Sequence, residues 1–186
     1  AVAPIVCLPQ LAPHAWAFWE PYGCTHDHLL PPDNFQEHPA AVIAHRTSPT
    51  NIGLSLLANL TAYDFGYIGA GQLIERTANT LGSMAALGRH EGHFYNWYDT
   101  QTLQPLSPLY VSSVDSGNLA GHLLTLRPGL LAVVDHPILE PRCFDGRNDT
   151  LRLVGDDAAL TAPAALARPP PAPPRFTNLP SFIRAT

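Results

Sequence analysis

The sequence predicts a mainly α-helical fold, built from helix hairpins with one short β-hairpin and with irregular N- and C-terminal ends. Three observations lead to this prediction. Apolar residues recur at helical spacing in three separate segments. The aromatic-rich segment 93–98 consists of residue types that favour strands. The 20 prolines are concentrated toward both ends, which indicates that the ends differ from the middle.

The first two helices are expected to form a hairpin. Ser48 can cap a helix that has Pro49 in its first position, and Gly66 can end that helix. A short link at 67–71 leads to a second helix, which ends at Gly88. The apolar stripes are Ile52, Leu56, Leu57 and Leu60 in the first helix, and Leu73, Ile74, Leu81, Met84 and Leu87 in the second. Because the link is short, the two helices should run antiparallel.

The segment after the second helix predicts a β-hairpin. Residues 93–98 form a strand in this interpretation, 99–102 a turn, and 103–106 a short returning strand. Strand alternation places Phe94, Asn96 and Tyr98 on one face, and His93, Tyr95, Trp97 and Asp99 on the other.

A third helix is expected to follow. Asp115 or Ser116 would cap it, and Pro128-Gly129 would stop it. Its apolar positions are Leu119, Leu123, Leu124 and Leu126. Leu130 to Val134 is then a candidate for a short strand.

The chain divides into three parts: an irregular part at 1–29, a helical part at 30–129, and an irregular Pro/Ala-rich tail at 130–186. In the first part, prolines at positions 4, 9, 13 and 21 argue against a long helix. In the last part, the composition from Ala158 onward is typical of a polyproline-type or disordered tail. The start lacks a basic n-region, so we interpret it as a fragment boundary rather than a signal peptide.

Composition argues against several classes of function. The formal net charge is -5, and the ten basic residues are arginines without a cluster, so no nucleic-acid partner and no direct membrane contact is expected. No apolar run approaches the roughly 18–20 residues of a membrane helix.

The cysteines at positions 7, 24 and 143 do not suggest a disulfide framework. The run Cys24-Thr25-His26-Asp27-His28 could suggest a metal site, but its ligands are too close together. We therefore expect an exposed loop there, no metal and no cofactor.

The connection lengths predict that the polar segments share one face. In a helix hairpin the second helix returns to the side where the first began, so the loop 31–47, the hairpin 93–106 and the turn at Asp115 should lie together. This is the arrangement of an α/α toroid, in which alternate connections are long and line a cleft.

The residue types on that face suit a sugar. Aromatic rings can stack on pyranose faces, and carboxylates and amides can bind hydroxyl groups. The predicted substrate-binding residues are Asp33, Glu37, His45, Arg46, Asn51, Asn96, Trp97, Tyr98, Asp115, Ser116 and Asn118. Glycoside chemistry needs a pair of carboxylates at a defined separation, which a sequence does not give. Asp99 and Asp115 are weak catalytic candidates, and the choice stays open.

Several of these residues also have a purely structural interpretation. The aromatic segment 93–98 could pack into the core. The segment Asp115 to Asn118 could be a simple helix cap. Arg46 could form an ion pair with Asp33 or Glu37.

Four blocks carry a family resemblance. They are Leu30 to Glu37 (LPPDNFQE), Ala44 to Leu54 (AHRTSPTNIGL), Gly92 to Asp99 (GHFYNWYD) and Tyr110 to Leu123 (YVSSVDSGNLAGHL). In this order and spacing they resemble the middle, glycoamylase-like region of bacterial cyclic β-1,2-glucan synthases. The resemblance implies an α/α-toroid region that takes part in the transglycosylation closing the glucan ring. It implies two partners, a β-1,2-glucan or other glucose oligosaccharide and the remainder of an inner-membrane synthase, with this segment in the cytoplasm.

Both ends of the chain depart from that family pattern. The glutamate-bearing motifs that follow the fourth block in the family are absent, so the segment should be inactive alone. Two other functions fit the same residues: a related endo-β-glucanase, in which water replaces the acceptor hydroxyl, and a non-catalytic glucan-binding module.

Overall fold

The computed structural model describes residues 8–21, 25–137 and 141–153. The described helices are α1 (Leu8–Trp19), α2 (Pro49–Asp64), α3 (Ala70–Ala86), α4 (Ser113–Val133) and α5 (Arg142–Leu153), with the 3-10 helix η2 (Thr25–Asp27). The short strands are β1 (Phe35–Gln36), β2 (Val42–Ile43), β3 (Arg46–Thr47), β4 (Arg89–His90), β5 (His93–Phe94) and β6 (Tyr98–Asp99). The chain is therefore mainly helical, as predicted.

Helices α2 and α3 form the predicted hairpin. The Ser48 hydroxyl accepts a hydrogen bond from the Asn51 N–H at 3.2 Å, and Pro49 occupies the first helical position. The chain leaves α2 through Gly66, whose φ of 77° lies in the left-handed region that glycine adopts at little cost. The Gln72 side chain accepts from the Gly69 N–H at the start of α3, at 3.0 Å.

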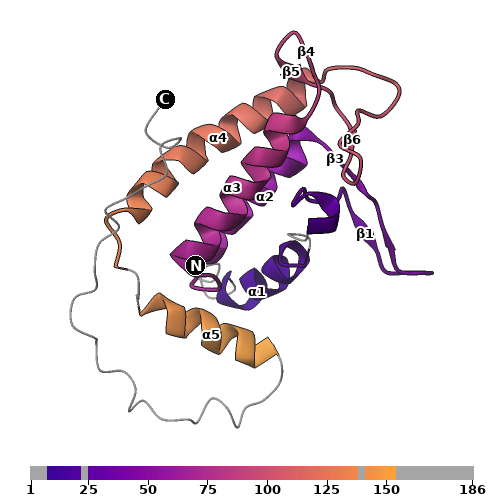
Figure 1. Cartoon of the computed structure of the whole chain (residues 1–186). Helices are drawn as coiled ribbons and strands as arrows, with labels where there is room; N and C mark the ends of the chain where they lie inside the picture. Colours follow the sequence, from indigo (N-terminus) through magenta and orange to yellow (C-terminus); the bar gives the residue numbers. More distant parts are fainter. Residues whose placement is uncertain (1–7, 22–24, 138–140, 154–186) are drawn as a thin grey trace, which may run out of the picture.

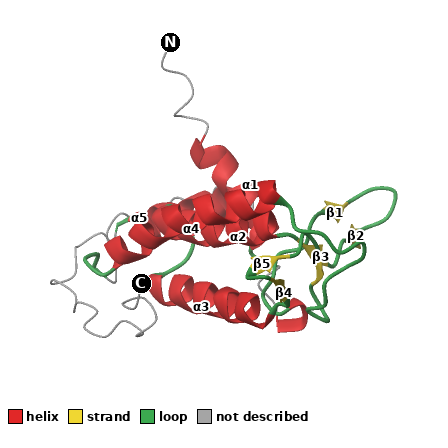
Figure 2. Cartoon of the chain, turned by 90° about the horizontal axis from the view of Figure 1, so that it is seen from above, coloured by secondary structure: helices red, strands yellow, loops and turns green. Residues whose placement is uncertain are grey.

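Helices α2, α3 and α4 lie side by side, and α4 packs extensively against α2 (Figures 1 and 2). Their shared core consists of Leu30, Ile52, Leu56, Met84, Leu87, Tyr98, Leu119 and Leu126. The short strands and long loops gather at one end of these helices, as Figure 2 shows. This end is where α2 and α4 begin, so the predicted sharing of one face by the polar segments is confirmed.

The single hairpin predicted for 93–106 forms only next to its turn, and the rest of its predicted pairing is wrong. Residues 93–98 split between two antiparallel pairs: β5 pairs with β4, and β6 pairs with β3. The returning segment makes one bridge, Tyr98 to Pro105, supported by the bond from Leu106 N to Trp97 O at 2.9 Å. Sequence periodicity identifies strand-like residues but cannot choose among distant partners, and here the partner of β6 lies in the loop before α2.

Two helices form where prolines argued against them. Helix α1 contains Pro13, and it places Trp16 in a second core with Tyr63, Leu73 and Val133. Helix α4 begins at Ser113 with Ser112 as its cap, and it continues through Pro128 to Val133, so residues 130–134 form no strand. A proline removes one helical hydrogen bond, and burial of the residues around it offsets that cost.

The C-terminal part also contains a helix, α5, where an irregular tail was expected. It packs against α1. The Ala/Pro-rich segment from Ala158, with Cys7 and Cys24, lies outside the described residues. In the part of the chain that the structure describes, no helix combines the length and the apolar character needed to cross a membrane.

Candidate functional site

Two helix N-termini meet at the strand-bearing end of the molecule. The Thr50 hydroxyl, in the first turn of α2, donates to Asp115 Oδ1 in the first turn of α4 at 2.6 Å. The Asn118 amide donates to the same hydroxyl oxygen at 3.1 Å. The Asp115 N–H is itself capped by the Ser112 hydroxyl at 3.1 Å. An acidic residue is favoured at this position, because the free N–H groups of a helix N-terminus attract negative charge.

Asn96 connects Asp115 to two aromatic residues. With its amide oriented to satisfy its neighbours, Asn96 donates to Asp115 Oδ2 at 2.8 Å. Its oxygen accepts from Trp97 Nε1 at 2.7 Å and from the Tyr110 hydroxyl at 2.6 Å. The backbone holds the same register, since Asn96 N donates to Tyr110 O at 2.9 Å. Because Asn96 is buried, its hydrogen bond to Nε1 holds the Trp97 ring in one orientation.

Asp33 and Arg46 complete the arrangement from the preceding loop. Arg46 donates to Asp33 Oδ2 through Nη2 at 2.8 Å and Nε at 3.1 Å. Asn51 donates to Asp33 Oδ1 at 3.2 Å. The Arg46 guanidinium lies over the Trp97 ring, 5.0 Å from its centroid. The ion pair foreseen as a structural alternative for Arg46 is therefore present, with Asp33 as its partner.

We refer to these connected residues as the polar face. It consists of Asp33, Arg46, Thr50, Asn51, Asn96, Trp97, Tyr110, Asp115 and Asn118. Most predicted substrate-binding residues are thus brought together, from the segment before α2, the first turns of α2 and α4, and the segment between α3 and α4. Thr50 and Tyr110 were not among them. Both lie within the four sequence blocks that carry the family resemblance, and their place in those blocks could have identified them as candidates.

Four predicted site residues lie apart from the polar face. Tyr98 is a correction: its side chain is fully buried in the core, where its hydroxyl donates to Gly88 O at 2.6 Å. Glu37 is exposed in the loop between β1 and β2. Ser116 lies in the first turn of α4, where its N–H donates to Ser112 O. His45 turns toward a different carboxylate.

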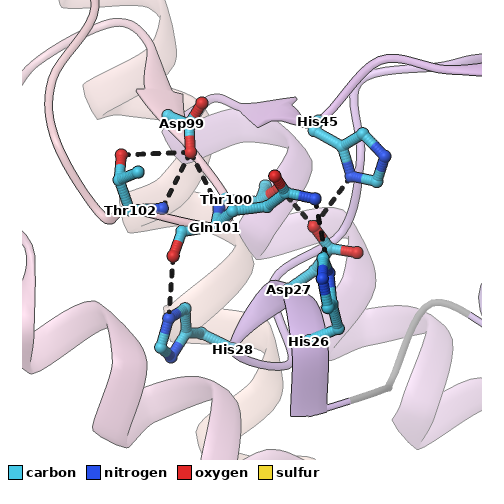
Figure 3. Close-up of polar contacts among 8 residues, drawn as sticks. All are labelled: His26, Asp27, His28, His45, Asp99, Thr100, Gln101 and Thr102. Carbon is cyan, nitrogen blue, oxygen red and sulfur yellow. Dashed lines mark hydrogen bonds and ion pairs between the residues drawn. The ribbon is translucent and has the colours of Figure 1, made fainter.

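That carboxylate is Asp27, which a sequence-based expectation of an exposed loop missed. Asp27 is buried, with 8% of its surface exposed. Its Oδ1 accepts from His45 Nδ1 at 2.9 Å and from the Thr100 hydroxyl at 2.7 Å (Figure 3). We name Asp27, His45 and Thr100 the Asp27 cluster. Periodicity gave no signal for it, because its three members are distant from one another in the sequence.

Asp99, a weak catalytic candidate, closes the neighbouring turn. Its Oδ1 accepts from the N–H groups of Gln101 and Thr102 at 2.9 and 2.8 Å, and from the Thr102 hydroxyl at 3.1 Å (Figure 3). These bonds, led by the one from the Thr102 N–H, hold the pKa of Asp99 below its ordinary value. Three donors on one oxygen are the pattern of a turn-stabilising residue.

The pKa of Asp115 is also lowered. Burial raises it, but hydrogen bonds from Ser112, Thr50 and Ser48 together outweigh burial. In the same way burial raises the pKa of Asp27, and bonds from Thr100 and His45 bring it below the ordinary value. Asp115 is therefore ionised at neutral pH and suits accepting hydrogen bonds or protons, not donating a proton as a general acid.

The free energy of unfolding is expected to fall in acid. Because Asp27, Asp99 and Asp115 have lowered pKa values when folded, the unfolded chain binds more protons in the acid range. Their stabilising contribution is complete above the ordinary carboxyl pKa of about 3.9 and is lost as the pH falls through the lower folded-state values. Urea unfolding at a series of pH values measures this effect. An unfolding midpoint that stays constant from about pH 6 to about pH 3 would contradict it.

Within the described residues, no group of three or more histidine, cysteine, aspartate or glutamate side chains is arranged to hold a metal ion.

Comparison with known proteins adds a sequence relative. No family model matches the chain. The chain is 47% identical over 117 residues to the cyclic β-(1,2)-glucan synthase NdvB of Rhizobium meliloti (strain 1021). The chain is similar to a cyclic β-1,2-glucan synthase. The match covers 63% of this chain but spans about 4% of the length of NdvB. The resemblance read from the four sequence blocks is thereby confirmed, for a segment of that much larger protein.

The fold has a relative among solved structures. The chain superimposes on the crystal structure of a protein assigned as a glucoamylase from Bacteroides fragilis NCTC 9343, with a TM-score of 0.57. The superposition covers 80% of this chain and 35% of that one, at 14% identity. At this identity the likeness concerns the fold alone. It confirms the predicted glycoamylase-like, α/α-toroid class of helix hairpins.

Proposed function

We propose that this chain is a glucan-binding part of the glycoamylase-like region of a cyclic β-1,2-glucan synthase. In this proposal the parent protein transfers glucan segments and closes the ring, and residues 30–129 supply one wall of the cleft. The observation that supports this proposal most directly is the polar face, a connected set of carboxylates and amides around one fixed tryptophan. It occurs in a chain that is 47% identical over 117 residues to NdvB. The parent would be attached to the inner membrane, with this segment on the cytoplasmic side.

The geometry supports a sugar in particular. Trp97 is held on one edge by Asn96 and covered on one ring face by Arg46, so its orientation is set before a ligand arrives. Around it, Asp33, Asp115 and Asn118 offer oxygen acceptors and amide donors at fixed positions. A pyranose presents hydroxyl groups in a ring around an apolar face, which an aromatic ring and its polar surroundings complement.

A complete catalytic pair is not part of this proposal. Asp115 is ionised and hydrogen-bonded, and Asp99 stabilises a turn. Glycoside chemistry requires a second carboxyl group that keeps its proton. We therefore propose that the chain binds glucan but does not transfer it alone, and that the remaining groups come from other parts of the parent.

Replacing Trp97 by alanine is expected to raise the Kd for linear β-1,2-glucan by at least about tenfold, which corresponds to about 1.4 kcal/mol. The change removes the stacking surface and the partner of Arg46. Calorimetric titration of the full chain measures the affinity. Trp19→Phe is the matched control, because Trp19 lies in α1 and contacts Phe18. Equal affinities for Trp97→Ala and Trp19→Phe would contradict the proposed site.

The activity belongs to the parent and is tested there. Incubation of the intact parent with linear β-1,2-glucan should yield cyclic product. New reducing ends without cyclic glucan would favour the endo-β-glucanase alternative instead, and failure to process the glucan at all would leave a binding module. Since the sequence relative is a glucan synthase, we propose cyclisation first.

A further inference from the structure

His45 connects the Asp27 cluster to the polar face. Its carbonyl oxygen accepts from Thr100 N at 3.1 Å, so its backbone is fixed against the 99–102 turn. The next residue is Arg46, which reaches Asp33 and Trp97 on the polar face. The ring is then fixed a second time, by the bond from Nδ1 to Asp27. A side chain anchored at both its backbone and its ring has little freedom left.

We propose that Asp27 is a positioning residue that holds His45 with its proton on Nδ1, so that Nε2 is an oriented acceptor for a sugar hydroxyl group. This inference rests on the proposed function and extends its binding site beyond the polar face. The occupant is a hydroxyl donor of the same glucan ligand.

The protonation of the ring follows from its partner. An ionised carboxylate only accepts hydrogen bonds, so a neutral His45 must donate from Nδ1 to Asp27 and carry a lone pair on Nε2. Asp27 is suited to this role, because it is buried and has a second donor, Thr100, on the same oxygen. The lowered pKa of Asp27 agrees with an acceptor that stays ionised.

The Asp27 and His45 side chains differ in their exposure to solvent, as their proposed roles require. The Asp27 side chain is 11% exposed and the His45 side chain is 39% exposed. Among the described residues, Nε2 of His45 makes no hydrogen bond, whereas Nδ1 does. The outward edge of the ring therefore presents an acceptor to solvent, beside the loop that carries Arg46. A buried acid that orients an exposed imidazole is a common way to fix the tautomer of a histidine.

The tautomer of His45 can be measured without any ligand. Two-bond ¹H–¹⁵N correlation spectra of the full chain in slightly alkaline solution should show His45 protonated on Nδ1. The signal is assigned by its loss in His45→Asn. In Asp27→Ala the ring should change to the Nε2-protonated form, and in Thr102→Ala, a control in the neighbouring turn, it should not. A wild-type His45 that carries its proton on Nε2 would overturn the proposal.

The binding role is tested with His45→Asn. The asparagine amide can still donate to Asp27 in place of Nδ1, but it has no acceptor in place of Nε2. The melting temperature should stay near that of the wild type, while the Kd for linear β-1,2-glucan should rise about tenfold. Unchanged affinity in His45→Asn would overturn the binding role. If the wild-type chain binds no glucan, the proposed function is wrong, and the tautomer spectrum then still decides whether Asp27 orients His45.

Discussion

Replacing Tyr98 by alanine is expected to lower the free energy of unfolding by about 3–5 kcal/mol, the usual cost of deleting a buried aromatic side chain. Tyr98 has no exposed surface and packs against Phe94 and Tyr95 with ring centroids 6.4 Å apart in each case. Its hydroxyl accepts from Tyr95 N at 2.7 Å and donates to Gly88 O at 2.6 Å. It therefore joins the end of α3 to the β5–β6 segment that carries Asn96 and Trp97.

Tyr98→Phe isolates the hydroxyl group. It leaves the ring in place but removes one partner from each of two backbone groups, which should cost about 1–3 kcal/mol. Tyr67→Phe is a matched control, because the Tyr67 hydroxyl is buried and has no hydrogen-bond partner among the described residues. Removal of that hydroxyl breaks no hydrogen bond and takes away a buried unpaired polar group, so Tyr67→Phe should leave the free energy of unfolding unchanged or raise it. Urea unfolding followed by circular dichroism measures both variants.

Tyr98→Phe also tests whether Tyr98 has a structural role or a binding role. Because the side chain is fully buried, Tyr98→Phe should bind linear β-1,2-glucan as tightly as the wild type under conditions where both are folded. A loss of affinity without a loss of stability would restore Tyr98 to the binding site and contradict its assignment to the core.

Gly53→Ala is the second large expected effect. An alanine normally stabilises a helix by about 1 kcal/mol relative to glycine. At position 53, however, the new methyl carbon would lie 2.9 Å from Cβ and Cγ of His122, and closer still to the ring nitrogen Nδ1. Because one of these atoms is the His122 Cβ, relief requires α4 to move away from α2. We expect a net loss of about 1–3 kcal/mol, typical of overpacking in a close helix contact.

Gly82→Ala tests the same substitution without the contact. Gly82 lies inside α3, and a Cβ added there meets nothing within 4 Å. This variant should be stabilised by about 0.5–1 kcal/mol. Denaturant unfolding of both variants gives the comparison. If Gly53→Ala is stabilised as much as Gly82→Ala, α4 does not pack on α2 as closely as described.

Much of this architecture can be predicted from local sequence signals. The cap at Ser48, the proline after it and the glycine at 66 set the bounds of α2 through interactions within a few residues. The apolar stripes set α3 in the same way. The alternation predicted for residues 93–99 agrees with burial only in part, since Asn96 and Tyr98 are buried but Phe94 is only partly buried, like Tyr95 and Trp97.

The errors share one physical cause. Proline argues against a helix locally, yet α1 and α4 form because Trp16 and Leu126 are buried against other elements. Strand-like residues at 98–99 pair with 46–47 as well as with the segment that follows them, and the first of these partners is distant in sequence. The sequence around Asp27 predicts an exposed loop, but Asp27 is buried and accepts hydrogen bonds from His45 and Thr100. In each case the deciding partner is distant in sequence, and no local pattern contains it.

By itself, the sequence determined the helix hairpin, the shared face for the long loops and the resemblance to cyclic β-1,2-glucan synthases, because these depend on local periodicity, connection length and residue order. Only the tertiary structure decided what each polar residue does. It placed Tyr98 in the core, joined Asn96 and Trp97 to Asp115, and directed His45 toward Asp27. Hydrogen bonds act over about 3 Å in space, and neighbours at that distance are set by how the helices pack.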